Sequence, residues 1–268
     1  MSSLTEVLSQ AKAENRAALV GYLPAGYPSV DGAIAACSAM IEGGVDILEV
    51  GLPYSDPQMD GPVIQRAVER ALEAGTNTLD VLRTVESLAR TGAPTLVMTY
   101  WNPIERYGVE RFAKEFADAG GAGLITPDLI PDEAAEWIAA SDEHRIDRTF
   151  LVSPSSTDDR IAMTVANCRG FVYATALMGV TGARTSVSRQ APELVERVRH
   201  ADPDMPVGVG LGVGNGAQAA EVAAFADGVI VGSALIRCVL DAPDRAAGLS
   251  RLRALSSELA EGVRSVPS

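Results

Sequence analysis

Short apolar segments rich in β-branched residues alternate with amphipathic segments along almost the whole chain. Eight segments have the length and composition of buried strands: 18–23, 47–51, 95–99, 123–126, 149–152, 171–174, 207–210 and 228–231. Seven segments between them repeat apolar residues at helical spacing: 30–42, 79–90, 108–119, 132–143, 158–167, 191–200 and 217–225. This alternation predicts an α/β fold of the (β/α)8 TIM-barrel type, with a doubly wound open sheet as the alternative.

Two further helical segments extend the pattern. Residues 4–12 predict an additional N-terminal helix that plugs one end of the barrel, and residues 234–239 predict a short helix after the eighth strand. No linker or shift in composition interrupts the 268 residues, a length at which α/β barrels form one domain. We therefore expect a single barrel domain that spans residues 1–268.

The chain is acidic: 22 Lys and Arg against 35 Asp and Glu give a net charge of −13. This balance argues against nucleic acid and anionic membranes as partners, because both need basic patches. Three scattered cysteines have no metal-ligand spacing and are expected to be free thiols in a reducing compartment. The N-terminal segment lacks the apolar stretch of a signal peptide or a membrane span, so we expect a cytoplasmic protein.

A carboxylate interrupts the second apolar segment, "DILEVG". Side chains alternate across a strand, so Leu48 and Val50 share the face that barrel helices cover, and Glu49 points into the barrel. There it lies near the carboxyl end of its strand, where barrel active sites are found. An internal salt bridge is the structural alternative, but none of the eight predicted strands contains Lys or Arg. The nearest, Arg148, immediately precedes the fifth strand, at the opposite end of the barrel. Desolvation raises the pKa of an unpaired Glu, which suits a group that gives and takes a proton near neutral pH.

Asp60 closes the loop that follows, "LPYSDPQMDGP". It is either a turn residue that bonds to its own backbone or a second catalytic carboxylate, and the loop sequence leaves both open. His144 and His200 fall in helical segments at the back of the molecule, and the sequence has neither a nucleophile elbow nor a metal-ligand cluster. Carboxylates are therefore the expected acid–base groups.

The last quarter of the chain carries two glycine-rich turns, "GLGVGNGAQAAEV" from Gly210 and "ADGVIVGSALI" from Ala226. Both follow predicted strands and open helices, so their backbone N–H groups form anion-binding positions. Barrels often bind phosphate here, with a short extra helix after the eighth strand. A dinucleotide-binding fingerprint is the weaker alternative, because the stretch comes late and lacks the ribose-binding acid that should follow.

The segment "LEVGLPYSDPQMDGPVIQ" closely resembles the signature of the tryptophan synthase alpha chain family. The resemblance continues through "GYLPAGYP", "MTYWNPIERYG", "TPDLIPDEA", "SPSSTDDRI", "GVTGAR" and "ADGVIVGSA", and it covers nearly the whole chain. It implies cleavage of indole-3-glycerol phosphate to indole and D-glyceraldehyde 3-phosphate, a retro-aldol reaction that needs no cofactor and no metal.

The resemblance also implies roles for individual residues. Glu49 matches the family's proton shuttle, and Asp60 matches the anion that stabilises charge on the indole ring. The phosphate positions are Gly182, Gly212, Gly232 and Ser233, and Thr181 would help to close a loop over the site. Four residues match positions that border the substrate: Tyr22, Tyr100, Asp128 and Tyr173. Leu211 and Ala176 stand where many members have Phe and Ser, which puts substrate affinity in doubt more than chemistry.

The implied partner is a tryptophan synthase beta chain, which uses pyridoxal phosphate to join indole and serine, in an α2β2 complex. Asp56, Pro57 and Asn102 match the contact positions of the family, although the aromatic and Pro-rich loops around them could simply wall the substrate pocket. Two other functions remain open. One is a stand-alone lyase that releases free indole, and the other is a non-catalytic regulatory subunit, which the intact pair of acids argues against.

Overall fold

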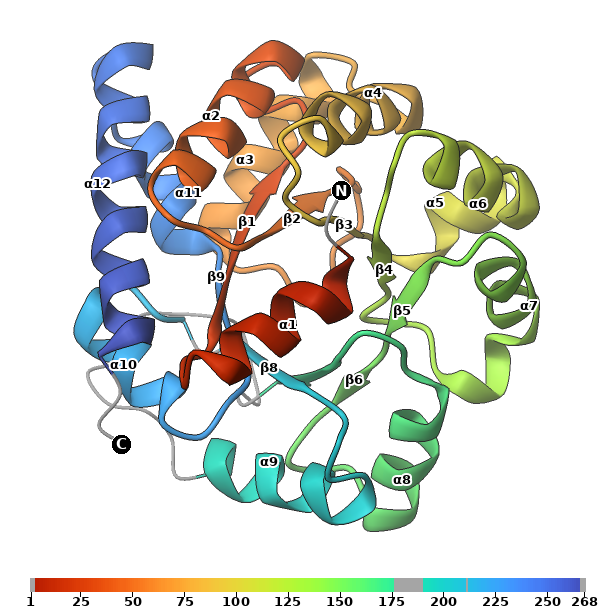
Figure 1. Cartoon of the computed structure of the whole chain (residues 1–268). Coiled ribbons are helices and arrows are strands. Elements are labelled where there is room, and N and C mark those ends of the chain that lie inside the picture. Colours follow the sequence, from red (N-terminus) through yellow and green to blue (C-terminus); the bar gives the residue numbers. More distant parts are fainter. Residues whose placement is uncertain (1–2, 176–189, 211, 266–268) are drawn as a thin grey trace.

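Nine parallel strands form one closed ring in the computed structural model, which describes residues 3–175, 190–210 and 212–265 (Figure 1). The strands are β1 (Ala18–Pro24), β2 (Ile47–Gly51), β3 (Thr95–Met98), β4 (Gly123–Ile125), β5 (Asp147–Thr149), β6 (Leu151–Val152), β7 (Val172–Thr175), β8 (Val207–Gly210) and β9 (Gly228–Val231). Their order is β5-β4-β3-β2-β1-β9-β8-β7-β6. β5 and β6 are two pieces of one strand, separated by Phe150, that pair with β4 and β7 respectively. The predicted (β/α)8 barrel is therefore confirmed over the open sheet.

The fifth strand differs from its prediction, because it begins at Asp147 and includes Arg148. The statement that no strand carries a cation is therefore wrong. The Arg148 guanidinium nevertheless points out of the barrel: it donates to the carbonyl oxygen of Asn167 at 2.7 Å and to Ser141 Oγ at 3.0 Å, and it pairs with Asp142. The outward direction of this side chain leaves the barrel interior without its charge.

The helices surround the strands (Figure 1). They are α1 (Leu4–Ala13), α2 (Val30–Glu42), α3 (Pro62–Glu73), α4 (Thr78–Ala89), α5 (Trp101–Tyr107), α6 (Val109–Asp118), the 3-10 turn η1 (Pro131–Glu133), α7 (Ala135–Glu143), α8 (Asp158–Asn167), α9 (Gln190–Ala201), α10 (Gly216–Ala223), α11 (Ser233–Leu240) and α12 (Arg245–Arg264). The hydrophobic pattern did not predict α3, α5 or α12. The long helix α12 packs against α2, α10 and α11, and its buried face includes glycines and serine, which an apolar-spacing test overlooks.

The N-terminal helix α1 lies across the amino-terminal end of the barrel, as predicted (Figure 1). Leu4, Leu8 and Ala11 are buried in a cluster with residues at the start of the strands, among them Ala18 and Ile47. This apolar layer closes that end of the barrel. None of the helices in the described ranges is long and apolar enough to cross a membrane.

Side-chain alternation along β2 places Glu49 as expected. Ile47 belongs to the inner cluster beneath α1, whereas Leu48 and Val50 belong to the larger cluster between the strands and the outer helices. Glu49 therefore points inward, one layer above Ile47. In the ladder between β1 and β2 its partner is Tyr22.

Candidate active site

A cavity of about 320 Å³ opens among the carboxyl ends of the strands. This volume falls within the range of small-molecule sites. The cavity is lined by Tyr22, Glu49, Gln58, Met59, Asp60, Ile64, Met98, Leu151, Tyr173, Thr175, Gly210, Gly212, Ile230, Gly232 and Ser233. It thus joins two carboxylates from β2 and its loop to the glycine-rich turns after β8 and β9. Neither Lys nor Arg occurs among these lining residues.

Glu49 is a buried acid with a strongly perturbed pKa. Its side chain is 1% exposed, and Oε2 has no hydrogen-bond partner in the described part of the chain. Burial, with a smaller contribution from the charge of Asp60, raises the pKa of Glu49 to about 8. The carboxyl is therefore mostly protonated at neutral pH and can act as a proton donor. With a pKa this close to neutral pH, its carboxylate form can also take a proton back.

Asp60 is held at the mouth of the cavity by Tyr100. The Tyr100 hydroxyl accepts hydrogen bonds from the backbone N–H groups of Gln58 and Met59 at 3.0 and 2.9 Å, and it donates to Asp60 Oδ1 at 3.4 Å. On the other side, Gln65 Nε2 donates to the backbone carbonyl of Asp60 at 2.8 Å. Burial raises the pKa of Asp60, and the hydrogen bond from Tyr100 opposes that shift.

The position of Asp60 bears on the two alternatives left open by the sequence. Its carboxylate faces the same cavity as Glu49, and its hydrogen bond within the described ranges comes from Tyr100 on another strand's loop, not from its own turn. It also lies just before the N-terminus of α3, where a helix favours an anion. This geometry favours a functional carboxylate over a turn residue.

The opposite end of the cavity is built from backbone. Gly212 has φ +71°, a conformation that favours glycine, and Gly232 precedes α11, whose first turn has no side-chain cap. Helix α10 differs, because Asn215 caps it and Glu258 Oε1 accepts a hydrogen bond from the Gly216 N–H at 2.9 Å. No side chain in the described ranges therefore caps the N–H groups at the start of α11 where they meet the cavity, an arrangement suited to a phosphate.

Two residues expected to border the substrate do not line the cavity. Tyr100 acts on the loop of Asp60 instead, and Asp128 Oδ1 accepts a hydrogen bond from the Trp101 N–H at 2.9 Å, at the start of α5. Four other residues discussed above lie outside the described residues: Thr181, Gly182, Leu211 and Ala176.

The expected partner contacts lie at the same end of the barrel. Asp56 and Asn102 are exposed, and Pro57 is partly exposed. Large exposed apolar side chains in the described residues are Met59, Leu79 and Ile130, and two of these, Met59 and Ile130, are in loops that follow strands β2 and β4. Apolar groups are therefore exposed beside the mouth of the cavity.

Several lining residues were not anticipated from the sequence. The apolar walls of the cavity come from Ile64, Met98, Leu151 and Ile230, and further surface comes from Gln58, Met59, Thr175 and Gly210. Side-chain alternation contained part of this signal, because Met98 follows Leu96, an inward residue of β3, by two positions.

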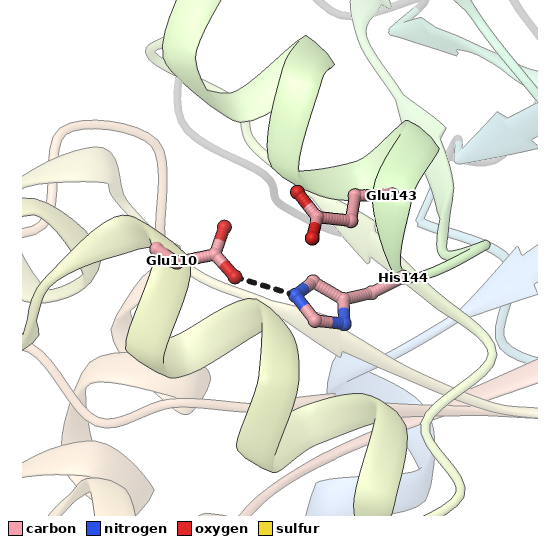
Figure 2. Close-up of side chains that lie close together, drawn as sticks. All are labelled: Glu110, Glu143 and His144. Atoms are coloured by element: carbon pink, nitrogen blue, oxygen red, sulfur yellow. Dashed lines mark hydrogen bonds and ion pairs between the residues drawn. The ribbon is translucent and has the colours of Figure 1, made fainter.

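One group of metal-ligand side chains occurs in the described ranges, and none of its members lines this cavity. Glu110 of α6 meets Glu143 and His144 at the end of α7, and their ligand atoms lie within 4.8 Å of one another (Figure 2). His144 Nε2 and Glu110 Oε1 are 2.7 Å apart. Both carboxylates are exposed, and the contact joins two outer helices, so we assign it a structural role.

The fold and the cavity together define the class: an α/β-barrel enzyme whose carboxyl-end pocket combines a protonated buried acid, a second carboxylate and a backbone site for an anion. The sequence profile described as "Tryptophan synthase alpha chain" matches residues 8–264. The chain belongs to the tryptophan synthase alpha chain family.

Individual relatives agree with this assignment. The tryptophan synthase alpha chain of Salinispora arenicola is 66% identical over 264 residues, which cover 98% of each chain. That of Mycobacterium tuberculosis is 60% identical over 263 residues, which cover 98% of this chain and 95% of the relative. A solved structure of Mycobacterium tuberculosis tryptophan synthase has a TM-score of 0.92 at 58% identity, covering 98% of this chain and 99% of that chain. The alpha subunit from Legionella pneumophila has a TM-score of 0.86 at 33% identity, covering 99% and 100%.

Proposed function

We propose that this chain cleaves indole-3-glycerol phosphate to indole and D-glyceraldehyde 3-phosphate as the alpha subunit of a cytoplasmic tryptophan synthase. The observation that carries the proposal is the shared cavity of Glu49 and Asp60. One acid is deeply buried and holds its proton at neutral pH, and the other lies at the mouth of the same pocket. The apolar wall accommodates an aromatic ring, and the uncapped start of α11 accommodates a phosphate.

The proposed reaction uses Glu49 twice. Its carboxylic acid first protonates indole C3, and the resulting carboxylate then removes the proton from the hydroxyl on the adjacent carbon. As that oxygen becomes the aldehyde carbonyl, the bond to indole C3 breaks and its electrons restore the aromatic ring. Glu49 ends the cycle protonated, so the net proton balance is zero and no cofactor is required.

Asp60 acts on the charge that develops between these steps. Protonation at C3 makes the indole nitrogen positive, and an ionised carboxylate that accepts a hydrogen bond from the N–H stabilises this charge. The two acids therefore need different protonation states. Glu49 is fully buried beside Asp60, whereas Asp60 is only partly buried and receives a hydrogen bond from Tyr100. The deeper burial of Glu49 favours its protonated form, and the hydrogen bond from Tyr100 favours the ionised form of Asp60 against the effect of its partial burial.

The phosphate is proposed to bind through backbone N–H groups of Gly212, Gly232 and Ser233. The lining residues that the structure describes carry no cation, and the positive end of α11 is proposed to supply the complementary charge. This arrangement agrees with the net charge of −13, because an acidic protein must attract its anionic substrate locally.

A beta chain is the proposed partner, docked on the face that carries Asp56, Pro57 and Asn102. Asn102 belongs to α5, whose N-cap is Tyr100, and the Tyr100 hydroxyl holds the loop of Asp60. A displacement of α5 or of the loop by a docked partner would therefore be transmitted to Asp60 through the Tyr100 side chain. Docking that orders this loop should raise kcat, because it fixes Asp60 against the ring and excludes water.

Indole release from indole-3-glycerol phosphate tests the proposal, measured with and without a tryptophan synthase beta chain. We expect weak release by the isolated chain and at least about tenfold activation by the partner, equal to roughly 1.4 kcal/mol of barrier. Glu49→Gln provides the inactive control. Full activity of the isolated chain, unchanged by the beta chain, would favour the stand-alone indole lyase. No release under either condition, with the beta chain still activated, would favour a non-catalytic regulatory subunit.

A further inference from the structure

The ring of Tyr22 lies between Gly232, at the phosphate end of the cavity, and Gly51, at the end of the strand that carries Glu49. A Cβ added at Gly232 would lie 3.3 Å from Tyr22 Cδ1, so one edge of the ring contacts the turn before α11. A Cβ added at Gly51 would lie within 3.0 Å of the Tyr22 hydroxyl oxygen, so the other end of the ring lies against the end of β2. Two glycines therefore make room for a phenol at this position.

The hydroxyl of Tyr22 lies at the Gly51 end of the ring. Gly51 is two residues beyond Glu49 on the same inward face, and Tyr22 pairs with Glu49 in the ladder between β1 and β2. The charges of Asp60 and Glu49 both add to the effect of burial in raising the pKa of Tyr22, so the hydroxyl lies within electrostatic range of both carboxylates.

The side chain of Tyr22 is also part of the cavity wall. Tyr22 is 7% exposed and lines the pocket, and none of the hydrogen bonds formed in the described part of the chain involves its hydroxyl. Within the described residues neither acid accepts a hydrogen bond from this donor, so it is available to a ligand in the cavity. A phenylalanine would form the same wall without this donor.

We propose that the Tyr22 hydroxyl binds the substrate hydroxyl next to the indole ring and turns its proton toward Glu49, so that Tyr22 determines specificity for a hydroxylated three-carbon chain. The inference rests on the proposed function and adds a recognition contact to it. In the proposed binding mode the indole ring lies at the acids and the phosphate at α11, so the first hydroxyl carbon of the substrate lies beside the indole ring, at the acid end. The hydroxyl of Tyr22 lies at that end.

The contribution of this hydrogen bond to substrate discrimination can be measured. A site that hydrogen-bonds a substrate hydroxyl discriminates against an analogue without it, because the buried polar group is then left unpaired. Removing the hydroxyl of Tyr22 should therefore lower kcat/KM for the hydroxylated substrate, whereas an analogue that lacks hydroxyls should bind equally well or more tightly. Loss of ring packing would affect both ligands.

The experiment crosses the variant Tyr22→Phe with two ligands in the complex of the alpha and beta chains. One ligand is indole-3-glycerol phosphate, measured as kcat/KM. The other is an analogue that joins indole to phosphate through an unsubstituted three-carbon chain, measured as a Kd. Tyr27→Phe is the matched control, because it removes a buried tyrosine hydroxyl from the loop after β1, outside the lining of the cavity.

We expect Tyr22→Phe to lower kcat/KM by about three- to tenfold while the Kd of the analogue stays the same or falls. Tyr27→Phe should change neither quantity. An equal loss for both ligands would overturn the inference in favour of ring packing, and unchanged kcat/KM would overturn it outright. If the wild-type complex binds the analogue but releases no indole from the substrate, the proposed function itself is wrong.

Discussion

Replacing Glu49 with Gln separates the acidity of this side chain from its shape. The folded protein raises the pKa of Glu49 from 4.5 to about 8. Between these two pH values the folded state holds the proton more tightly than the unfolded chain, so the stability of the wild type falls as pH rises through this window. Gln stays neutral at every pH and lacks this dependence.

The magnitude follows from the shift. One pKa unit corresponds to about 1.36 kcal/mol. Between about pH 5 and about pH 7.5 the Glu49 side chain is mostly ionised in the unfolded chain and mostly protonated in the folded protein. The free energy of unfolding of the wild type should therefore fall by roughly 3 kcal/mol more than that of Glu49→Gln over this interval. At neutral pH the variant should be the more stable protein, although its kcat should be lower by about 10³-fold or more.

Urea unfolding at several pH values measures the first effect, and indole release measures the second. The two proteins should have similar unfolding midpoints near pH 5 and diverge as pH rises, with similar slopes against urea concentration. Parallel stability profiles from pH 5 to pH 8 would show that Glu49 is not a desolvated acid. Near-normal turnover by Glu49→Gln would end its assignment as the proton shuttle even if the stability profiles diverge.

Three further predictions address the rest of the site. Asp60→Asn keeps the size of the side chain and loses the anion, so kcat should fall much further than affinity; a fully active variant would make Asp60 a turn residue. Gly232→Val should raise KM by about tenfold or more, because its side chain enters the space between Tyr22 and the start of α11, whereas Arg237→Ala at an exposed position of α11 should do far less. Comparable KM values for these two variants would indicate a phosphate clamp made of side chains. Pro57→Ala with Asn102→Ala should reduce activation by a beta chain while the basal rate of indole release is retained, and a lower basal rate with normal activation would place these residues in the pocket instead.

The strand and helix pattern was predictable because it is local. Apolar runs of four to six residues, separated by amphipathic segments, follow from the periodicities of strand and helix, and the repetition around eight strands restricts the topology. The inward direction of Glu49 follows from the same period of two. The elements that the pattern missed also have local explanations. The polar residues Asp147 and Arg148 obscured the start of the fifth strand, and glycines and serine on its buried face made α12 look insufficiently apolar.

The role of the loop residues followed partly from the sequence and partly from the tertiary structure. The sequence placed Asp60 in a turn-rich loop and left open whether it is a turn residue or a catalytic carboxylate, because loop composition does not determine where a side chain points. Only the closed ring of strands brings the Tyr100 hydroxyl from the end of β3 to the backbone of Gln58 and Met59, and thus directs Asp60 toward Glu49. The expectation that Tyr100 borders the substrate missed this contact, since the two segments are about forty residues apart.

The sequence by itself therefore determined which residue types stand at the carboxyl ends of the strands: one acid near the end of the second strand, a second acid in the loop that follows it, and glycines after the last two strands. The tertiary structure decided which of them meet. Burial of Glu49 beside Asp60, the turn of Arg148 away from the interior and the position of the Tyr22 phenol between Gly51 and Gly232 all arise from contacts across the barrel. The pKa of a carboxyl and the reach of a hydroxyl depend on neighbours from other strands, and local periodicity contains no information about them.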